Sequence, residues 1–204
     1  MPNYIVHIVE DDPDLRASLL TALELEGYIV KVWPSATQLL DNNPPHKEPT
    51  VIVTDMRLGD VSGLRMHQTL IGQGKRIPII YISGESRPSE IIESMKLHPI
   101  DFLLKPFSRS SLLQAIQIGI SLSKEIIESE RIEGEKKKAI AILSPREVEV
   151  FNLLSQGKSN SEIVQELRVS LPTAKQYKTQ VMRKLNFKSL AELIGFSQSL
   201  RRNH

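Results

Sequence analysis

Apolar residues recur in two different rhythms along the first part of the chain. Short runs rich in β-branched and aromatic residues occur at Tyr4–Val9, Tyr28–Trp33, Val51–Val53, Ile77–Ile82 and Phe102–Leu104. The segments between them place apolar residues at helical spacing, as in Leu15, Leu19, Leu20 and Leu23. Strands that are apolar almost throughout are typical of a parallel sheet covered on both faces. Residues 1–122 are therefore predicted to form a doubly wound α/β domain with a five-stranded parallel sheet.

The pattern changes after residue 122. Residues 123–142 are mostly charged and carry no strand signal, which predicts a last helix that continues into a helical linker. Two interpretations of this helix stay open. The apolar positions could continue as a dimer-forming stripe, or the helix could be a solvated spacer. The positions concerned are Leu112, Ile116, Leu122 and Ile126.

From Leu143 onward the sequence has helix signals and no strand signals. Ser144-Pro145-Arg146-Glu147 matches a capping box with proline in the first turn. Further caps are expected at Ser159 or Ser161, near Ser170 and near Ser189. Residues 143–204 are therefore predicted to form a compact all-α domain of four short helices.

Charge is distributed unevenly between these segments. Residues 1–124 carry 12 basic and 14 acidic side chains, 125–142 carry 4 and 5, and 143–204 carry 10 and 5, so the net charges are −2, −1 and +5. The basic third segment is the candidate for binding a polyanion. The chain contains no cysteine, which excludes disulfides, thiolate metal sites and thiol catalysis and fits a cytoplasmic protein. We expect neither an export signal nor a membrane span, because no apolar run approaches the roughly 20 residues required.

Acidic, hydroxyl and amine side chains follow the predicted strands. Asp11 and Asp12 come after the first strand, Asp55 after the third, Ser83 ends the fourth and Lys105 follows the fifth. The carboxyl ends of parallel strands share one edge of a sheet, so these groups should converge. Clustered carboxylates repel unless a cation joins them, and oxygen ligands favour Mg²⁺. The set has the parts for phosphoryl transfer to Asp55 as the nucleophile, although an Asp after a strand also often caps a helix.

These residues lie in motifs that resemble the receiver domains of two-component response regulators. The motifs are Val9-Glu10-Asp11-Asp12, Val53-Thr54-Asp55-Met56-Arg57-Leu58, Ile82-Ser83-Gly84 and Asp101-Phe102-Leu103-Leu104-Lys105-Pro106-Phe107. The resemblance covers residues 4–122. It implies that Asp55 accepts a phosphoryl group from a histidine kinase, that Asp11, Asp12 and the Arg57 carbonyl hold Mg²⁺, and that Ser83 and Lys105 contact the phosphoryl group. It also implies a cis peptide bond before Pro106 and a switching role for Ser83 and Phe102. The alternative for Phe102 is that its ring is an ordinary core aromatic.

Residues 143–200 are similar to the LuxR-type helix-turn-helix. The similarity is carried by Leu143–Val150, Gly157–Ile163 and Val169–Lys175. Independently, Thr173–Lys184 predicts a helix with an apolar back and a basic, amide-bearing front, which fits a DNA major groove. We assign Lys175, Lys178 and Lys184 to phosphates and Gln176 and Thr179 to base edges. Thr173 and Arg183 belong to the same predicted surface, and Lys158 and Ser159 would grip the backbone at the start of the preceding helix.

The sequence departs from these families at several positions. Gly59 follows Leu58 where a proline is frequent, which predicts a looser loop after Asp55. His98 replaces a glycine-containing turn and is followed by Pro99. Arg168, Tyr177 and Asn186 replace a frequent glycine, histidine and glycine.

The combined prediction is a DNA-binding response regulator of the FixJ/NarL type. Phosphorylation of Asp55 would promote homodimerisation and control transcription from double-stranded DNA, with a histidine kinase and RNA polymerase as further partners. An alternative is a transcription regulator that works without phosphorylation. A Mg²⁺-dependent hydrolase is disfavoured, because Met56-Arg57-Leu58 offers no second acid to protonate a leaving group, so the chain is not expected to be an enzyme.

Overall fold

The computed structural model describes residues 4–44, 47–84 and 88–201. The chain divides into two compact units, and the boundary between them along the chain falls between Ser129 and Glu130, inside the predicted linker 123–142. The helix that contains this boundary, α5, runs over Arg109–Ala141. Across the described ranges, no helix combines the length and the apolar character needed to cross a membrane.

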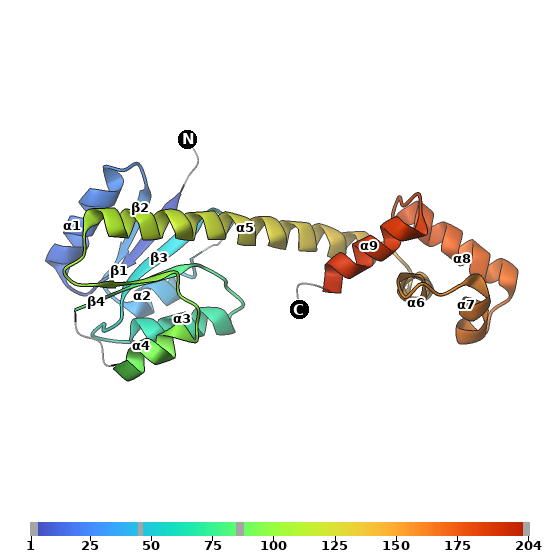
Figure 1. Cartoon of the computed structure of the whole chain (residues 1–204), viewed down its shortest axis with the longest axis horizontal. Helices are drawn as coiled ribbons and strands as arrows, with labels where there is room; N and C mark the ends of the chain where they lie inside the picture. Colours follow the sequence, from blue (N-terminus) through green and yellow to red (C-terminus); the bar gives the residue numbers. More distant parts are fainter. Residues whose placement is uncertain (1–3, 45–46, 85–87, 202–204) are drawn as a thin grey trace. The chain divides into compact units, whose positions relative to one another are not determined.

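The first unit is built on one parallel sheet with strand order β2-β1-β3-β4-β5 (Figure 1). This arrangement confirms the predicted doubly wound fold. The strands are β1 (Ile5–Val9), β2 (Ile29–Trp33), β3 (Thr50–Asp55), β4 (Ile79–Ser83) and β5 (Asp101–Leu104). The helices between them are α1 (Pro13–Glu24), α2 (Ala36–Asp41), α3 (Gly63–Gly72) and α4 (Pro88–Met95), and α5 follows the last strand.

Helices cover both faces of the sheet, which explains the continuous apolar runs in the sequence. On one face α1 and α5 pack against side chains such as Val6 and Ile80, and on the other α2 and α3 pack against Ile52 and Tyr81. Every residue of the three central strands is buried, whereas the edge strands β2 and β5 expose some of theirs. Burial on two faces is what the sequence pattern of the central strands requires.

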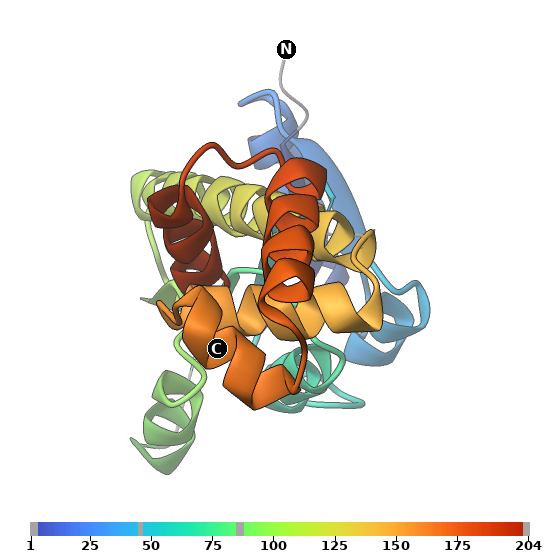
Figure 2. The same cartoon turned by 90° about the vertical axis from the view of Figure 1, so that its right-hand side faces the viewer.

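The second unit contains α6 (Pro145–Ser155), α7 (Asn160–Leu167), α8 (Leu171–Lys184) and α9 (Leu190–Arg201), which Figure 2 turns toward the viewer. Capping boxes at Ser144 and Ser159 start α6 and α7, and Ser170 caps α8. The Ser189 hydroxyl accepts from the Glu192 amide in the first turn of α9. The helices share a core that includes Val150, Leu154, Ile163, Ala174, Val181 and Leu193.

Several helices end with a residue of positive φ, which lets the next amide donate to the carbonyl five residues back. A glycine holds this position after α1, α3 and α6. Arg168 (φ 52°) holds it after α7 and Asn186 (φ 56°) after α8, where the amides of Val169 and Phe187 make the closing bond at 3.3 and 2.9 Å. Both turns therefore keep the shape that glycine gives, at a steric cost that is larger for Arg168 than for Asn186.

The end of α4 is closed more weakly. His98 also has a positive φ of 53°, but Pro99 follows it and has no N–H to donate. Two bonds one turn back remain, from the Leu97 amide to the Ser94 carbonyl (3.0 Å) and from the His98 amide to the Met95 carbonyl (3.1 Å). The turn between α4 and β5 thus lacks the bond that closes α7 and α8.

In the part of the first unit that the structure describes, two histidines are buried. His7 accepts a hydrogen bond from the Trp33 indole N–H (2.9 Å) and stacks on its ring, and the His67 Nδ1 lies 2.9 Å from the Tyr81 hydroxyl. Burial lowers the pKa of both imidazoles from 6.5 to about 4, with Lys31 adding to the effect at His7. Both rings are therefore neutral in the folded protein at neutral pH.

We expect acid to destabilise this protein through these two histidines. Their pKa values are lower in the folded than in the unfolded chain, so between about pH 6.5 and about pH 4 the unfolded chain binds more protons and the free energy of unfolding falls. Each histidine should account for roughly 2 kcal/mol at about pH 5. Urea denaturation at about pH 7 and about pH 5 measures the difference. His67→Gln should remove part of it; a pH dependence equal to that of the wild type would contradict the assignment.

Candidate functional site

Three of the predicted groups meet at the carboxyl edge of the sheet. Asp55 ends β3, Ser83 ends β4, and Lys105 follows β5, whose Leu104 is paired with Ser83. The Lys105 Nζ lies 2.6 Å from the Asp55 Oδ2, and both Asp55 and Ser83 are buried. The sheet register therefore places a carboxylate, an ammonium and a hydroxyl-bearing residue together, as the sequence predicts.

Glu10 is a fourth member of this cluster, and sequence reasoning missed it. Its side chain is 2% exposed, and its Oε2 lies 3.0 Å from the Lys105 Nζ. Burial raises the pKa of Glu10, and the ion pair with Lys105 opposes that rise only in part. The signal that identifies Glu10 is its position directly after the last residue of β1, where its amide still donates to the Trp33 carbonyl of the neighbouring strand.

The structure does not bring Asp12 into the cluster. Its exposed carboxylate caps α1 by accepting from the amides of Asp14 (2.8 Å) and Leu15 (3.1 Å), bonds that lower its pKa. Asp11 is also exposed, but its Oδ2 faces the loop after β3, because a β-carbon added to Gly59 would lie 3.7 Å from that oxygen. The Arg16 guanidinium donates to the carbonyls of Glu10 (2.6 Å) and Asp11 (3.2 Å) and so fixes the acidic turn.

The loop after Asp55 is held tightly, in contrast to the looser loop that Gly59 suggested. Asp60 accepts from the amides of Ala36 and Thr37 and thereby caps α2. Gly63 approaches the backbone so closely that an added β-carbon would lie 2.3 Å from the Asp55 carbonyl oxygen. The Arg57 amide donates to the Asp55 Oδ1 at 2.8 Å, which fixes the orientation of the carboxylate.

The Arg57 side chain reaches in the other direction, toward α4. Its Nη2 lies 3.2 Å from the Glu90 Oε2, in an ion pair that is partly exposed. Such a pair contributes about 1 kcal/mol or less. This ion pair nevertheless joins two segments of the domain. One is the loop after Asp55, in which the Arg57 amide donates to the Asp55 carboxylate, and the other is the first turn of α4.

The donor set of this cluster suits a hard divalent cation. Glu10, Asp11 and Asp55 contribute carboxylates at one edge, and Lys105 is the ammonium placed between two of them. Within residues 4–44, 47–84 and 88–201, no three acidic or histidine side chains converge closely enough to enclose a metal ion. Mg²⁺ does not require such an enclosure, because it binds through one or two carboxylates and retains water. The oxygen-only donors therefore fit Mg²⁺, with Glu10 and Asp11 as the pair after β1.

Phe102 and Pro106 lie beside this edge. The half-buried Phe102 ring contacts the Tyr81 ring on the neighbouring strand, with ring centroids 5.5 Å apart. The peptide bond between Lys105 and Pro106 is cis, as the family resemblance implies. Phe102 thus has a place in the core, and the switching role assigned to it stays a prediction.

The second candidate site is the outer face of α8. Lys175, Gln176, Thr179 and Arg183 are exposed there, whereas Ala174 and Val181 are buried in the core. A hollow of about 570 Å³ runs along this face and is lined by Lys175, Lys178, Thr179, Met182, Arg183, Asn160, Phe187 and Lys188. Lys188 is a further cation on this surface that the sequence analysis did not select, because it lies beyond the end of α8.

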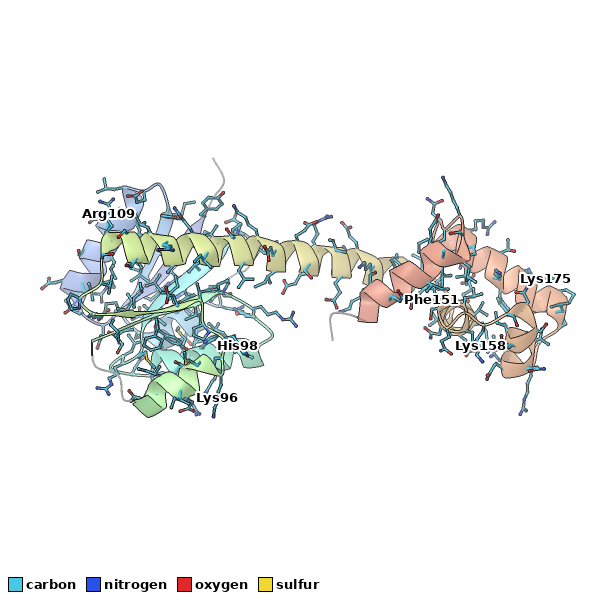
Figure 3. All side chains as sticks on the ribbon, viewed as in Figure 1. Lys96, His98, Arg109, Phe151, Lys158 and Lys175 are labelled. Carbon is cyan, nitrogen blue, oxygen red and sulfur yellow. The ribbon has the colours of Figure 1, made fainter. Side chains whose placement is uncertain are left out.

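Other predicted DNA contacts have partners within the domain. The Lys184 Nζ lies 2.7 Å from the Oε2 of the buried Glu147, so this lysine ties α8 to the capping box of α6. Lys158 pairs with Glu162 at 3.0 Å, and Ser159 caps α7. The Thr173 hydroxyl bonds to Ser170 at the start of α8. Figure 3 labels Lys175 and Lys158, which lie near the amino-terminal ends of α8 and α7.

Comparisons with known proteins agree with both halves of this description. The response regulator receiver domain family matches residues 6–117, and the family of bacterial regulatory proteins of the LuxR type matches residues 141–197. The transcriptional regulatory protein FixJ of Azorhizobium caulinodans is 35% identical, over 93% of this chain and 89% of its own. Nodulation protein W of Bradyrhizobium diazoefficiens is 34% identical, over 96% of this chain and 86% of its own.

Solved structures give the same result. The response regulator StyR matches with a TM-score of 0.80 and 29% identity, over 96% of this chain and 98% of that one. Full-length FixJ from B. japonicum matches with a TM-score of 0.59 and 29% identity, over 98% of each chain. FixJ is a transcriptional regulatory protein, and the family is one of transcription regulators. The chain belongs to the FixJ/NarL-type response regulators, in which a receiver domain is joined to a LuxR-type DNA-binding domain.

Proposed function

We propose that Asp55 is the phosphoacceptor through which a histidine kinase controls this regulator. The observation that carries the proposal is the short contact between the Lys105 ammonium and a nearly buried Asp55 carboxylate. The Asp55 oxygen attacks the phosphorus of the kinase phosphohistidine, so that an O–P bond forms and the P–N bond breaks. Lys105 would offset charge on the transferring group, the Ser83 hydroxyl would bond one of its oxygens, and the Arg57 amide keeps the carboxylate oriented.

The cation proposed for this site is Mg²⁺, held by Glu10, Asp11, Asp55 and the Arg57 carbonyl. When bound, Mg²⁺ offsets negative charge on the phosphoryl oxygens. Glu10 takes the place given to Asp12 in the sequence analysis, because Glu10 is buried beside Lys105 and Asp12 is engaged as a helix cap. Arg16 is a positioning residue, since it holds the carbonyls of the acidic turn.

Phosphorylation is proposed to favour a receiver dimer. Apolar side chains are exposed on α4, β5 and α5, and they include Ile92 (60%), Met95 (64%), Leu104 (60%) and Ile118 (52%). Exposed apolar groups gathered on neighbouring elements are typical of a protein–protein interface. Ser83 and Phe102 lie between Asp55 and this surface, so a shift of both on phosphorylation would alter it.

The output is proposed to be binding of double-stranded DNA by α8 in the major groove. The exposed Gln176 and Thr179 would read base edges, whereas Lys175, Lys178, Arg183 and Lys188 would contact phosphates. Lys158 and the start of α7 would grip the DNA backbone, and RNA polymerase is a further proposed partner. We place these events in the cytoplasm, where the DNA is.

Phosphorylation should require Asp55 and should change assembly and DNA affinity together. With Mg²⁺ and a small phosphodonor or beryllofluoride, the wild type is expected to shift toward dimer and to bind DNA about tenfold or more tightly. Asp55→Asn should show neither change. Mass by light scattering and DNA binding by fluorescence anisotropy are the measurements, and equal mass and affinity in both states would favour a regulator that works without phosphorylation.

Glu10 and Asp12 offer a matched test of the metal site. Glu10→Gln should weaken Mg²⁺ binding by about tenfold or more and slow the labelling of Asp55 in proportion, because a buried carboxylate donor is lost. Asp12→Asn should leave both nearly unchanged, since Asn caps a helix as well as Asp does. Calorimetric titration with Mg²⁺ gives the affinity without any need for phosphorylation. If Asp12→Asn has the larger effect, Asp12 is the Mg²⁺ ligand, as the sequence predicts, and the assignment of Glu10 is wrong.

Substitutions on α8 should separate phosphate contacts from base contacts. Lys175→Ala is expected to weaken binding to all sequences and to reduce the salt slope by about 1, because one fewer counterion is released. Gln176→Ala should change the preferred base and leave the salt slope in place. Titrations over a range of salt with a set of operator variants measure both. An unchanged salt slope for Lys175→Ala would show that this lysine does not contact a phosphate.

A further inference from the structure

A second cavity lies at the opposite end of the receiver sheet from Asp55. It has a volume of about 520 Å³ and includes Ile77, Pro78 and Ile79 at the amino end of β4. The end of α3 and the turn after it, the turn between α4 and β5, and one side of α5 complete the wall. Volumes of this size are typical of small-molecule sites, which are mostly apolar with a few polar groups.

The wall of this cavity is apolar with a basic rim. Ile71 and Leu122 contribute exposed apolar surface (48% and 39%), and Ile126 and Ile100 extend it. Lys75, Arg76, His67 and His98 are its titratable residues, and none of its lining residues is acidic. The Lys75 ammonium is engaged by Asn43 and the Pro44 carbonyl. Arg76 and His98 are exposed, and no carboxylate among the described residues forms an ion pair with either. The lining thus suits an apolar body with one negative charge.

One wall of the cavity is linked to the Asp55 edge by aromatic and polar contacts. His67 lines the cavity and is hydrogen-bonded through Nδ1 to the Tyr81 hydroxyl at 2.9 Å. The fully buried Tyr81 ring contacts Phe102, the residue assigned to switching. Tyr81 and Ser83 are two positions apart on β4 and so face the same side of the sheet. His98, labelled in Figure 3, lies on the turn before β5, at the amino end of that strand, whereas Asp55 lies at the carboxyl end of β3.

We propose that this cavity binds a small amphipathic carboxylate, and that its occupancy is coupled to Phe102 through Tyr81 and His67. The apolar part of the ligand would lie against Ile71, Leu122 and Ile126, with the carboxylate toward Arg76 and His98. A ligand that contacts His67 favours one placement of the Tyr81 hydroxyl and ring, and the Phe102 ring packs on that ring. The coupling, but not the site itself, rests on the proposed switching role of Phe102, and coupling acts equally in both directions.

Binding can be tested on the unphosphorylated full chain with a charged probe and its neutral counterpart. Phenylbutyrate is expected to shift the backbone amide resonances of Ile71, Lys75, Ile79, His98 and Ile100 in a saturable way. Its Kd from these shifts should be about tenfold lower than the Kd of phenylbutanol. Arg76→Gln should remove that preference for the acid. Arg65→Gln, a control at an exposed position on α3 outside the cavity, should retain it. Equal binding of the acid and the alcohol, no saturable shift at these residues, or equal effects of both variants would overturn the site.

The coupling has a separate test. Loading Asp55 with beryllofluoride should change phenylbutyrate affinity by about fivefold or more, and phenylbutyrate should change the beryllofluoride midpoint by the same factor. Tyr81→Phe keeps the ring but removes the bond to His67, so it should abolish this factor while the probe still binds. If beryllofluoride leaves the phenylbutyrate affinity of the wild type unchanged, the proposed coupling is wrong, but the proposed binding site is not affected. Failure of beryllofluoride to bind at all would instead count against the proposed function of Asp55.

Discussion

The Lys105 ammonium lies between two carboxylates that are almost removed from water, Glu10 and Asp55. Two carboxylates about 4 Å apart repel by about 4 kcal/mol at an intermediate dielectric, and an ammonium that contacts both carboxylates offsets that repulsion. One positive charge does not balance Glu10, Asp11 and Asp55 together. The remaining imbalance favours a bound cation. Burial of the Glu10 carboxylate raises its pKa, and the ion pair with Lys105 opposes that rise only in part. The proposed transfer of a phosphoryl group to Asp55 would add further negative charge beside the Arg57 amide and the Lys105 ammonium, which are already in place.

Much of this arrangement could be predicted because it follows from local patterns. The three central strands are apolar throughout since both of their faces are covered, and that pattern alone gives the sheet and the edge at which Asp55, Ser83 and Lys105 meet. The choice between Glu10 and Asp12 depended on the last residue of β1, and element ends are uncertain by one or two residues. The Asp12-Pro13-Asp14 sequence indicates that Asp12 caps a helix, because an N-cap followed by proline at the first helical position is a helix start.

The contacts that the sequence could not predict join residues brought together only by packing. His67 and Tyr81 are on different elements, as are Trp33 and His7, and neither pair has a spacing that reveals it. Lys184 belongs by pattern to a basic helix surface, yet it bonds the buried Glu147, because the cap of α6 packs against the end of α8. In each case the partner of the polar group is set by tertiary structure and not by its spacing in the sequence.

The weakly closed end of α4 lies beside the second cavity, and the start of α4 is paired with the loop after Asp55. After α7 and α8 the chain accepts the steric cost of a positive φ and gains a hydrogen bond to the carbonyl five residues back. At His98 the chain accepts the same cost without that gain, because Pro99 has no N–H. A helix end with fewer closing bonds is easier to displace.

At its other end, α4 is joined to the Asp55 loop by the Arg57–Glu90 ion pair, which is partly exposed and weak. Because β4 is packed on both faces and does not deform smoothly, movement in response to charge at Asp55 should concentrate in α4 and the turn that follows it. That turn also forms the rim of the second cavity, so a ligand there and a phosphoryl group at Asp55 would act on the same weakly closed helix.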